Sequence, residues 1–332
     1  MLSSLVVFSF LLCLTLDVSQ AKLCRDISGR WVNKLGSEVV LDHLQSGVLQ
    51  GQYYTAVSVS AGKLLGHDIL GTLPYNKPGS SFAFSVTWQN GSSTTVWTGQ
   101  CMVCNGKEML ETSWLLRSHV DSCFDKWKST RIGKDVFERK MTTVGTPEEN
   151  LRIVAGNSIG HKCDLRGVWY NGVGSEIILN QTESGIISGE YRTAVERDKG
   201  SAGQSHSAIY GFGRFAHPNT TFSLIVVWRD GASVTGWVGQ CHICENNTAI
   251  LEMNWLLRSK VDSCIDVWKS TMYGANTFTR HEQKSGPRKS LGKHTPNRDG
   301  EDVGGTSCLK FSGILLVAIL FPMWTLINLS FP

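Results

Sequence analysis

The stretch Trp114-Leu-Leu-Arg-Ser118 is followed by Val-Asp-Ser-Cys at 120–123, and both motifs return later in the chain, at 255–259 and 261–264. Motifs that return in the same order indicate an internal duplication. The repeat is much longer than that of a solenoid, so each copy should fold around a core of its own. The chain therefore contains two copies of one domain.

The copies are bounded by segments of different composition. We place the first copy at 24–140 and the second at 163–281, with a polar linker at 141–162 between them. With 41% hydrophobic and only 18% charged residues, the chain is too apolar for a disordered protein. A formal net charge of +4 is too slight to argue for a nucleic-acid partner, and no nucleic-acid-binding motif is present.

The two ends of the chain lie outside the repeat. Residues 1–21 combine a short apolar run with small residues at its end, which predicts a signal peptide. Residues 282–303 are polar and indicate a stalk. The tail 304–332 joins small residues, Gly304 and Gly305, to an uncharged apolar end, which predicts a GPI-attachment signal. A transmembrane tail is the alternative, and in both cases we expect an extracellular protein, held at the cell surface or secreted.

Short runs of alternating residues fill each copy, as in Gly51-Gln-Tyr-Tyr-Thr-Ala-Val57 and Phe82-Ala-Phe-Ser-Val-Thr-Trp88. A period of two is typical of antiparallel strands with one buried face. Asn90-Gly91 and Asn105-Gly106 are hairpin-turn signals. About eight such runs fit into one copy, without a long helical pattern, so two tandem eight-stranded up-and-down β-barrels are favoured over sandwiches.

The alternation also predicts what each barrel encloses. It puts Trp31 and Asn33 on one face together with Leu35 and Ser37, and it groups Tyr53, Thr55 and Val57 on another. Buried polar groups need partners, and an interior with aromatic walls and scattered hydroxyls and amides suits one small polar ligand. The alternative is a packed core whose polar groups satisfy one another.

Five ordered motifs of the first copy resemble the avidin family. They are Trp-x-Asn-x-Leu-Gly-Ser at 31–37, Gly-x-Tyr-x-Thr-Ala-Val at 51–57, Ser-Thr-Thr-Val-x-Thr-Gly-Gln-Cys at 93–101, Asn-Gly-Lys-Glu-x-Leu-x-Thr-x-Trp-Leu-Leu-Arg-Ser at 105–118 and Trp-Lys-x-Thr-Arg-x-Gly at 127–133. The resemblance implies an eight-stranded barrel that binds biotin and assembles with other barrels into a group of four. Two chains could build that group, or one chain could fold as a pseudo-dimer.

The resemblance also implies a role for each residue of the first copy. A deep polar group would bind the ureido ring and the ring sulfur, an aromatic wall would enclose them, serines would hold the carboxylate, and Trp127 would reach a neighbouring pocket. The implied site is Asn33, Leu35, Ser37, Tyr53, Thr55, Val57, Ser58, Ser60, Trp88, Ser93, Thr95, Trp97, Trp114, Leu116, Trp127 and Asp135.

The second copy keeps the deep polar group but differs at the mouth, where Glu196-Arg197-Asp198 replaces Ser58-Val59-Ser60. Glu196 would repel the biotin carboxylate, whereas Arg197 could pair with it. The implied site is Asn171, Val173, Ser175, Tyr191, Thr193, Val195, Trp228, Ser233, Thr235, Trp237, Trp255, Leu257, Trp268 and Asn276.

Four cysteines in each copy allow three connectivities. Cys101 and Cys104 lie three apart on a predicted strand and point to opposite faces, so they should have separate partners. By the resemblance Cys24 pairs with Cys101, which leaves Cys104 with Cys123. The second copy would follow with Cys163–Cys241 and Cys244–Cys264. A redox or zinc site at the two CxxC motifs is the rival interpretation.

Sequons for N-glycosylation stand at predicted turns or loops, at Asn90, Asn180, Asn219 and Asn246. No nucleophile elbow, zinc-protease motif or phosphate-binding loop is present. We therefore expect no enzyme, no catalytic residue, no metal and no cofactor, with biotin as a ligand. The alternative function is a cell-surface interaction or adhesion module that keeps the barrel but binds a protein or another ligand.

Overall fold

The alternating runs of the first copy form strands that pair antiparallel with their neighbours in sequence. In the computed structural model they are β1 (Lys22–Leu23), β2 (Gly29–Asn33), β3 (Glu38–His43), β4 (Val48–Tyr54), β5 (Gly66–Thr72), β6 (Ser81–Trp88), β7 (Ser93–Cys104), β8 (Lys107–Ser118) and β9 (Thr130–Arg139), with the short helix η1 (Gln89–Gly91). Strands β2 to β9 form barrel 1, because β9 pairs with both β2 and β8 and closes the sheet. β1 adds two residues at the edge of β7.

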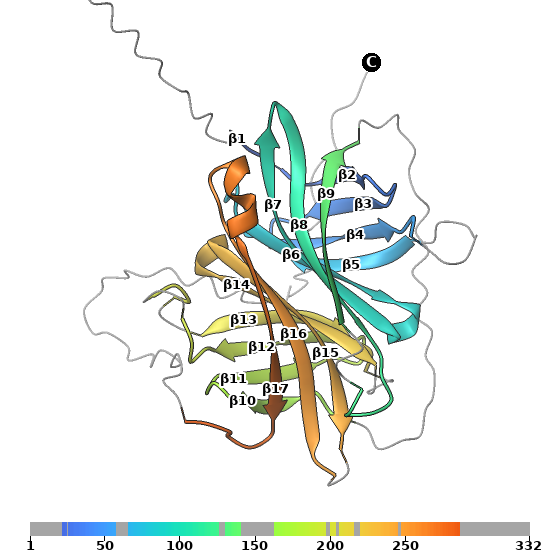
Figure 1. Cartoon of the computed structure of the whole chain (residues 1–332), viewed down its shortest axis with the longest axis vertical. Coiled ribbons are helices and arrows are strands. Elements are labelled where there is room, and N and C mark those ends of the chain that lie inside the picture. The colour runs from blue at the N-terminus through green and yellow to red at the C-terminus, as the bar shows by residue number, and fades with distance from the viewer. Residues whose placement is uncertain are drawn as a thin grey trace, which may run out of the picture. The chain divides into compact units, whose positions relative to one another are not determined.

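The second copy repeats this arrangement as a closed barrel, barrel 2 (Figure 1). Its strands are β10 (Gly167–Asn171), β11 (Glu176–Gln181), β12 (Ile186–Arg192), β13 (Ser207–Gly213), β14 (Thr221–Trp228), β15 (Ser233–Ile243), β16 (Ala249–Ser259) and β17 (Thr271–Thr279), with the short helices η3 (Arg229–Gly231) and η4 (Cys264–Lys269). The predicted fold of two tandem eight-stranded antiparallel barrels is confirmed.

The structure describes residues 22–24, 26–57, 66–125, 130–140, 163–196, 200–203, 206–215, 220–244 and 247–285. The predicted signal peptide, linker and tail, with Gly304 and Gly305, lie outside these ranges, as do most of the stalk and the sequons at Asn219 and Asn246. No helix within the described ranges is long and apolar enough to cross a membrane.

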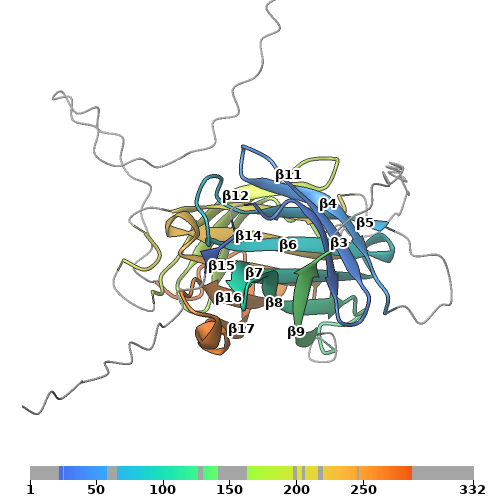
Figure 2. The same cartoon turned by 90° about the horizontal axis from the view of Figure 1, so that it is seen from above.

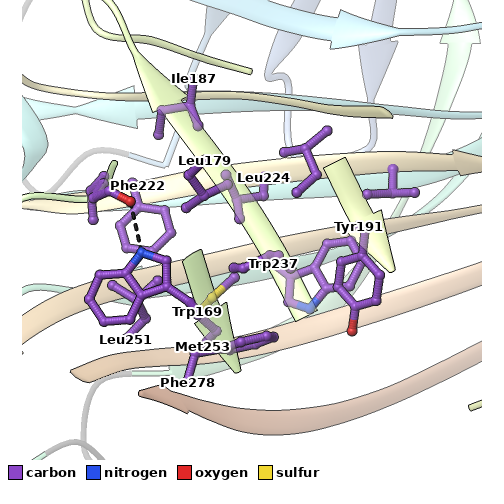
Figure 3. Packing of buried hydrophobic residues seen from close by; sticks show 14 of the residues in the cluster. Trp169, Leu179, Ile187, Tyr191, Phe222, Leu224, Trp237, Leu251, Met253 and Phe278 are labelled. Carbon is purple, nitrogen blue, oxygen red and sulfur yellow. Dashed lines mark hydrogen bonds between the residues drawn. The ribbon is translucent and has the colours of Figure 1, made fainter. Parts of the chain in front are cut away.

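A buried tryptophan lies at one end of each barrel interior. Trp31 and Trp169 are fully buried, and their indole N–H groups donate to the carbonyls of Ile27 (2.9 Å) and Leu165 (2.8 Å). The guanidinium of Arg139 lies over the Trp31 ring. The guanidinium of Arg280 lies over the Trp169 ring in the same way. In barrel 2, Figure 3 shows Trp169 and Phe222 at one end of the buried cluster and Tyr191 and Trp237 at the other. We call the Trp31 and Trp169 ends the bases and the opposite ends the mouths.

The two barrels fall in one compact unit and share a third apolar cluster. Strands β6 and β7 contact β14 and β15 (Figure 2). The buried side chains of the shared cluster are Ala83, Val96, Leu115, Ile225, Val234, Val238 and Leu256. An interface of this kind, built from buried aliphatic side chains on both partners, resembles a domain core more than a transient contact.

Polar contacts across the interface come in pairs related by the duplication. Gln100 exchanges two hydrogen bonds with the backbone of Val261, through Nε2 (2.8 Å) and Oε1 (3.0 Å), and Gln240 does the same with Val120. Such reciprocity is the property of a two-fold interface in which the same patch is used on both sides. The single chain therefore builds the equivalent of a symmetric dimer.

A pair of buried arginines follows the same symmetry. Arg117 and Arg258 are both 1% exposed, and burial lowers the pKa of each to about 10, against the attraction of Glu252 and Glu111 respectively from the other barrel. Arg117 also donates to Oδ1 of Asn254 (3.1 Å). Each guanidinium is thus attracted by a carboxylate of the other barrel.

Two of the four predicted disulfides are wrong. Cys24–Cys101 and Cys163–Cys241 form within the barrels as predicted, but Cys104 bonds Cys264 and Cys123 bonds Cys244. The prediction that Cys101 and Cys104 have separate partners is confirmed. Cys104 points out of barrel 1, so its partner depends on how the two barrels pack. A resemblance to proteins with a single barrel gives no information on that packing. All four CxxC cysteines are in disulfides, which contradicts the zinc or redox interpretation.

Two of the sequons lie in the described ranges. Asn90 is exposed in the η1 turn with a left-handed backbone (φ 61°), as expected of a turn. The prediction of a turn at Asn180 is wrong, because Asn180 lies in strand β11. Its side chain is exposed. Oδ1 of Asn90 accepts a hydrogen bond from Arg214 of barrel 2 (2.7 Å).

The crossed disulfides predict the behaviour of a cut chain. After cleavage at a protease site introduced within 141–162, the two halves should stay together on a denaturing gel until they are reduced, because two disulfides join the barrels. The Cys104→Ser/Cys123→Ser variant removes both crossing bonds and should separate without reductant. Separation of the unaltered halves without reductant would show that the pairing lies within the barrels.

Candidate functional site

The mouth of barrel 1 begins with a turn built on Asn33. Its Oδ1 accepts hydrogen bonds from the backbone N–H groups of Leu35 (3.0 Å) and Ser37 (2.9 Å). These bonds end β2 at Asn33 and stop the alternation there. The predicted common face is therefore wrong at Leu35, which is 65% exposed, whereas Ser37 is buried as predicted.

The Asp135 carboxylate joins two deep side chains of barrel 1. Nδ2 of Asn33 donates to Oδ1 (3.3 Å), and Nε1 of Trp97 donates to Oδ2 (3.4 Å). Burial raises the pKa of Asp135, and the bonds from Trp97 and Asn33 act against that rise. Each carboxylate oxygen can accept more than one hydrogen bond, so Asp135 keeps capacity for a ligand N–H group.

The Tyr53 hydroxyl completes the polar group. Burial raises the pKa of Tyr53, and the charge of Asp135 raises it further, whereas a hydrogen bond with Ser37 acts against the rise. The phenol therefore stays protonated at neutral pH and can donate to a ligand oxygen. Oγ of Ser37 also accepts from the backbone N–H of Ala56 (3.0 Å), which ties the loop after β4 to the turn before β3.

Aromatic rings surround this group. The Tyr53 ring stacks on Trp97, with 4.9 Å between centroids, and meets Trp88 edge to face at 5.6 Å. Nε1 of Trp88 donates to Oγ1 of Thr95 (2.7 Å), so the ring and the buried hydroxyl hold each other in place. The structure thus brings Asn33, Ser37, Tyr53, Trp88, Thr95, Trp97 and Asp135 together at one end of barrel 1.

Trp114 is the register partner of Trp97 on the neighbouring strand. Its ring lies over Gly133, where a Cβ atom would come within 2.3 Å of Cζ2. Glycine is therefore required at this position for the ring to lie flat on β9, and Trp255 lies over Gly274 in the same way. Trp114 and Trp255 are half-buried and pack against the apolar clusters of their barrels.

The remaining predicted residues lie at the rim or outside the description. Val57 is 67% exposed, because β4 ends at Tyr54 and the alternation does not extend to it. Oγ1 of Thr55 accepts from the N–H of Val57 (3.1 Å), while Ser93 and Leu116 are half-buried on β7 and β8. Ser58, Ser60 and Trp127 lie outside the described residues.

Barrel 2 repeats most of this geometry. Oδ1 of Asn171 accepts from the N–H groups of Val173 (3.2 Å) and Ser175 (2.9 Å), Tyr191 stacks on Trp237 at 5.3 Å, and Nε1 of Trp228 donates to Oγ1 of Thr235 (2.8 Å). Burial raises the pKa of Tyr191 to about 12, against hydrogen bonds with Ser175 and Asn171. Thr193 is buried, Ser233 and Leu257 are half-buried, Val173 and Val195 are exposed, and Trp268 falls in η4, where only its backbone is described.

The two barrels differ at one deep position. Asn276 takes the place of Asp135, since Met253 pairs with Asn276 in the register where Thr112 pairs with Asp135. Nε1 of Trp237 is buried and has no hydrogen-bond acceptor among the described residues, whereas Nδ2 of Asn171 lies close to the Tyr191 phenol. Their counterparts in barrel 1 are the two groups that bond Asp135.

The Glu196 carboxylate is occupied by its own loop. Oε2 accepts from the N–H of Gly200 (2.9 Å) and Oε1 from the N–H of Ala202 (3.3 Å). A carboxylate bonded to two backbone N–H groups has a fixed direction and a partly compensated charge. Its repulsion of a ligand carboxylate is therefore weaker than the bare charge implies. Arg197 lies outside the described residues.

Two cavities lie at the bases, away from the predicted site residues. One of about 190 Å³ is lined by Cys24, His43 and Tyr75, and one of about 260 Å³ by Cys163, Arg166 and Phe215. The predicted site residues lie at the opposite ends of the same strands. In barrel 1 the mouth contains stacked aromatic rings.

A model described as the avidin family matches residues 21–140 and 159–281. The chain belongs to the avidin family. Avidin of Gallus gallus is 41% identical over 126 residues, which are 37% of this chain and 82% of that protein. Fibropellin-1 of Strongylocentrotus purpuratus is 35% identical over 126 residues, 38% of this chain, but the matched part is only 12% of fibropellin-1.

Solved structures of similar sequence cover one barrel each. The X-ray structure of a biotin binding protein from chicken is 42% identical, covers 35% of this chain and 97% of its own, and has a TM-score of 0.33. The crystal structure of Xenavidin is 36% identical, covers 36% of this chain and 100% of its own, and has the same TM-score. Membership of the avidin family agrees with the expectation that this chain binds and does not catalyse.

Sequence reasoning missed two side chains at the mouth of this avidin-family barrel. The imidazole of His67 meets the Trp88 ring at 4.8 Å, and burial lowers the pKa of His67. Phe84 stacks on Trp97 at 5.1 Å. The alternation along β6 was sufficient to place Phe84 inside with Trp88, whereas His67 carries no local signal, because its position depends on the register between β4 and β5.

The bond between Trp228 and Thr235 gives a stability prediction. Thr235→Val leaves the indole N–H of Trp228 buried without an acceptor and should lower the free energy of unfolding by about 1–3 kcal/mol. Thr72→Val is the control, because the Gly47 carbonyl to which Thr72 donates keeps its bond from Leu73 (2.9 Å). Urea denaturation measures both. Equal losses in the two variants would contradict a role for this bond.

Proposed function

We propose that both barrels bind biotin in their interiors, without chemistry. The observation that carries this proposal is the convergence, in each barrel, of an amide, a serine and a neutral tyrosine beneath a stacked aromatic pair. A preformed group of this kind loses little entropy when a rigid cyclic urea enters. Burial between tryptophan rings adds the hydrophobic contribution.

We assign a partner on that ligand to each polar side chain. Tyr53 and Ser37 carry hydroxyl donors for the ureido oxygen, and Asp135 carries acceptors for a ureido N–H. Thr95, held by Trp88, faces the region of the ring sulfur. Hydrogen bonds in a dry site discriminate strongly, because an unmatched ligand leaves buried groups unpaired.

A group of four barrels, made by two chains, is part of the proposal. Each chain already joins two barrels through a symmetric interface. Ile132 on β9 is 52% exposed and Tyr273 on β17 is 65% exposed, and the two occupy equivalent register positions, next to Gly133 and Gly274. Large exposed apolar side chains at equivalent places on both barrels support a second interface between chains.

We also propose that the tail anchors the protein at the cell surface. Four disulfides are typical of a chain that folds in an oxidising compartment. The apolar, uncharged end of the sequence supports attachment through a lipid more than through a spanning helix. The domain limits given above and the glycans belong to the same proposal.

A second candidate function is supported by the match to fibropellin-1, in which the avidin-like part is a small share of a long protein. In that case the barrels would act as an interaction or adhesion module at the cell surface. Biotin binding and adhesion separate experimentally, because only the first depends on the side chains inside the barrels.

Thermal unfolding of the extracellular part with and without biotin tests the main proposal. Biotin at a thousand times its Kd should add about 4 kcal/mol to the stability of the native state. Tyr53→Phe combined with Tyr191→Phe removes a hydroxyl from each site and should weaken binding about tenfold, or about 1.4 kcal/mol. Tyr54→Phe, on the opposite face of β4, should leave binding unchanged. A melting temperature unmoved by saturating biotin would refute the proposal and favour the adhesion module.

A further inference from the structure

Each base cavity is bordered by a cationic side chain that bonds the turn at the mouth of the other barrel. Lys77 borders the cavity of barrel 1, and its Nζ pairs with Oδ2 of Asp230 in η3 (2.7 Å). Arg214 borders the cavity of barrel 2, and its Nη2 donates to Oδ1 of Asn90 in η1 (2.7 Å). The duplication relates the two contacts, because Asn90 and Asp230 occupy the same place in η1 and η3.

The two contacts differ in charge. Lys77 meets a carboxylate, so its charge is balanced. Arg214 meets a neutral amide, and it forms no ion pair with any described residue. Its Nε is buried and has no hydrogen-bond partner within the same ranges. A buried N–H donor without an acceptor is unfavourable, so this contact lacks an acceptor that a further group can supply.

The turn η1 is fixed against barrel 2 at this point. Oγ1 of Thr221 donates to the carbonyl of Gly91 (3.1 Å) and bonds Oγ1 of Thr94 (2.7 Å). A Cβ atom on Gly91 would come within 2.6 Å of Cβ of Thr220, which also lines the cavity of barrel 2. A group attached to Asn90 therefore stays close to that cavity.

Asn90 is the asparagine of the sequon Asn90-Gly-Ser92. A glycan is attached to Nδ2, which makes no hydrogen bond to a described residue, while Oδ1 keeps its bond with Arg214. Both atoms belong to one planar amide, so the first sugar lies beside the Arg214 guanidinium. Because Arg214 borders the cavity of barrel 2, the sugar lies at the entrance of this cavity.

The cavity suits one sugar ring. Its volume of about 260 Å³ is just under the range of about 300–1,000 Å³ that is usual for pockets of drug-sized ligands. Its lining combines the Phe215 ring with the Arg214 guanidinium, and the Arg166 guanidinium lies over the Phe215 ring at 5.6 Å. An N-acetylhexosamine has C–H groups that pack on an aromatic ring, and its acetamido carbonyl and hydroxyl groups accept hydrogen bonds.

We propose that the base cavity of barrel 2 binds the first N-acetylglucosamine of a glycan on Asn90. The sugar supplies the acceptor that Nε of Arg214 lacks, and it links the mouth turn of barrel 1 to the base of barrel 2. The proposal rests on the proposed glycosylation of Asn90. It goes beyond it, because it makes the sugar part of the interface between the barrels.

Enzymatic deglycosylation of the folded extracellular part, followed by mass spectrometry of each sequon, tests the proposal. Peptide-N-glycosidase cuts between the asparagine and the first sugar, so it should release the Asn90 glycan at least about tenfold more slowly from the folded than from the denatured protein. Asn180 is the exposed reference, because it alternates with Gln181, which lines the cavity. Its glycan should be released from the folded protein without such protection.

Variants of the cavity assign the protection to its lining. Arg214→Ala removes the polar contact and Phe215→Leu removes the aromatic one, and each should abolish most of the protection at Asn90. Lys77→Ala is the matched control, because it breaks the equivalent contact at the cavity of barrel 1. It should leave the release of the Asn90 glycan unchanged.

Stability gives a second measurement that does not depend on access of an enzyme. Ser92→Ala removes the sequon but keeps the Asn90 side chain, whereas Ser92→Thr keeps the sequon. The alanine variant should melt about 2–4 °C below the threonine variant. The difference should vanish when both are produced in a host that adds no glycans. Trimming the glycan to its first sugar should leave the melting temperature unchanged, because only that sugar lies in the cavity.

The outcomes separate this inference from the glycosylation on which it rests. An unprotected Asn90 glycan, protection that both cavity variants leave unchanged, or protection of the Asn180 glycan instead would overturn the inference while glycosylation stands. An Asn90 that carries no sugar would overturn the proposed glycan at this sequon and the inference with it. Biotin binding does not depend on any of these results.

Discussion

Closure of each sheet is the constraint on which the rest of this structure depends. Because β9 pairs with both β2 and β8, and β17 with both β10 and β16, neither sheet has a free edge through which its inner face could reach solvent. Every inward side chain must then pack or form hydrogen bonds inside. At the bases this is done by Trp31 and Trp169, whose indoles donate to backbone carbonyls, and at the mouths by polar groups that are bonded to one another.

Much of this arrangement is predictable from the sequence. The duplication and the alternation were sufficient to predict the two barrels. The resemblance to the avidin family selected deep residues that the structure brings together at one end of barrel 1. The predicted inward orientation of Leu35 and Val57 is wrong for a local reason. The Asn33 turn and the end of β4 interrupt the alternation before it reaches these residues. The predicted disulfide between Cys104 and Cys123 is wrong for a long-range reason, since the partner of each cysteine lies in the other copy.

The interface between the barrels shows what the duplication makes possible. The reciprocal bonds of Gln100 and Gln240, the equivalent buried arginines Arg117 and Arg258, and the crossed disulfides are those of a symmetric dimer within one chain. Because the two halves are encoded separately, however, their interiors need not be equal. Asp135 and Asn276 occupy equivalent register positions and are an example of such a difference.

The central claim is that the mouths, and not the bases or the interface, receive the ligand. A crystal structure of the extracellular part grown with biotin tests it most directly. Our account predicts electron density for a bicyclic ring inside barrel 1, with its ureido oxygen at Tyr53 and Ser37 and an N–H group at Asp135. Density confined to the base cavities beside Cys24 or Cys163, or barrel interiors left empty at saturating biotin, would contradict it.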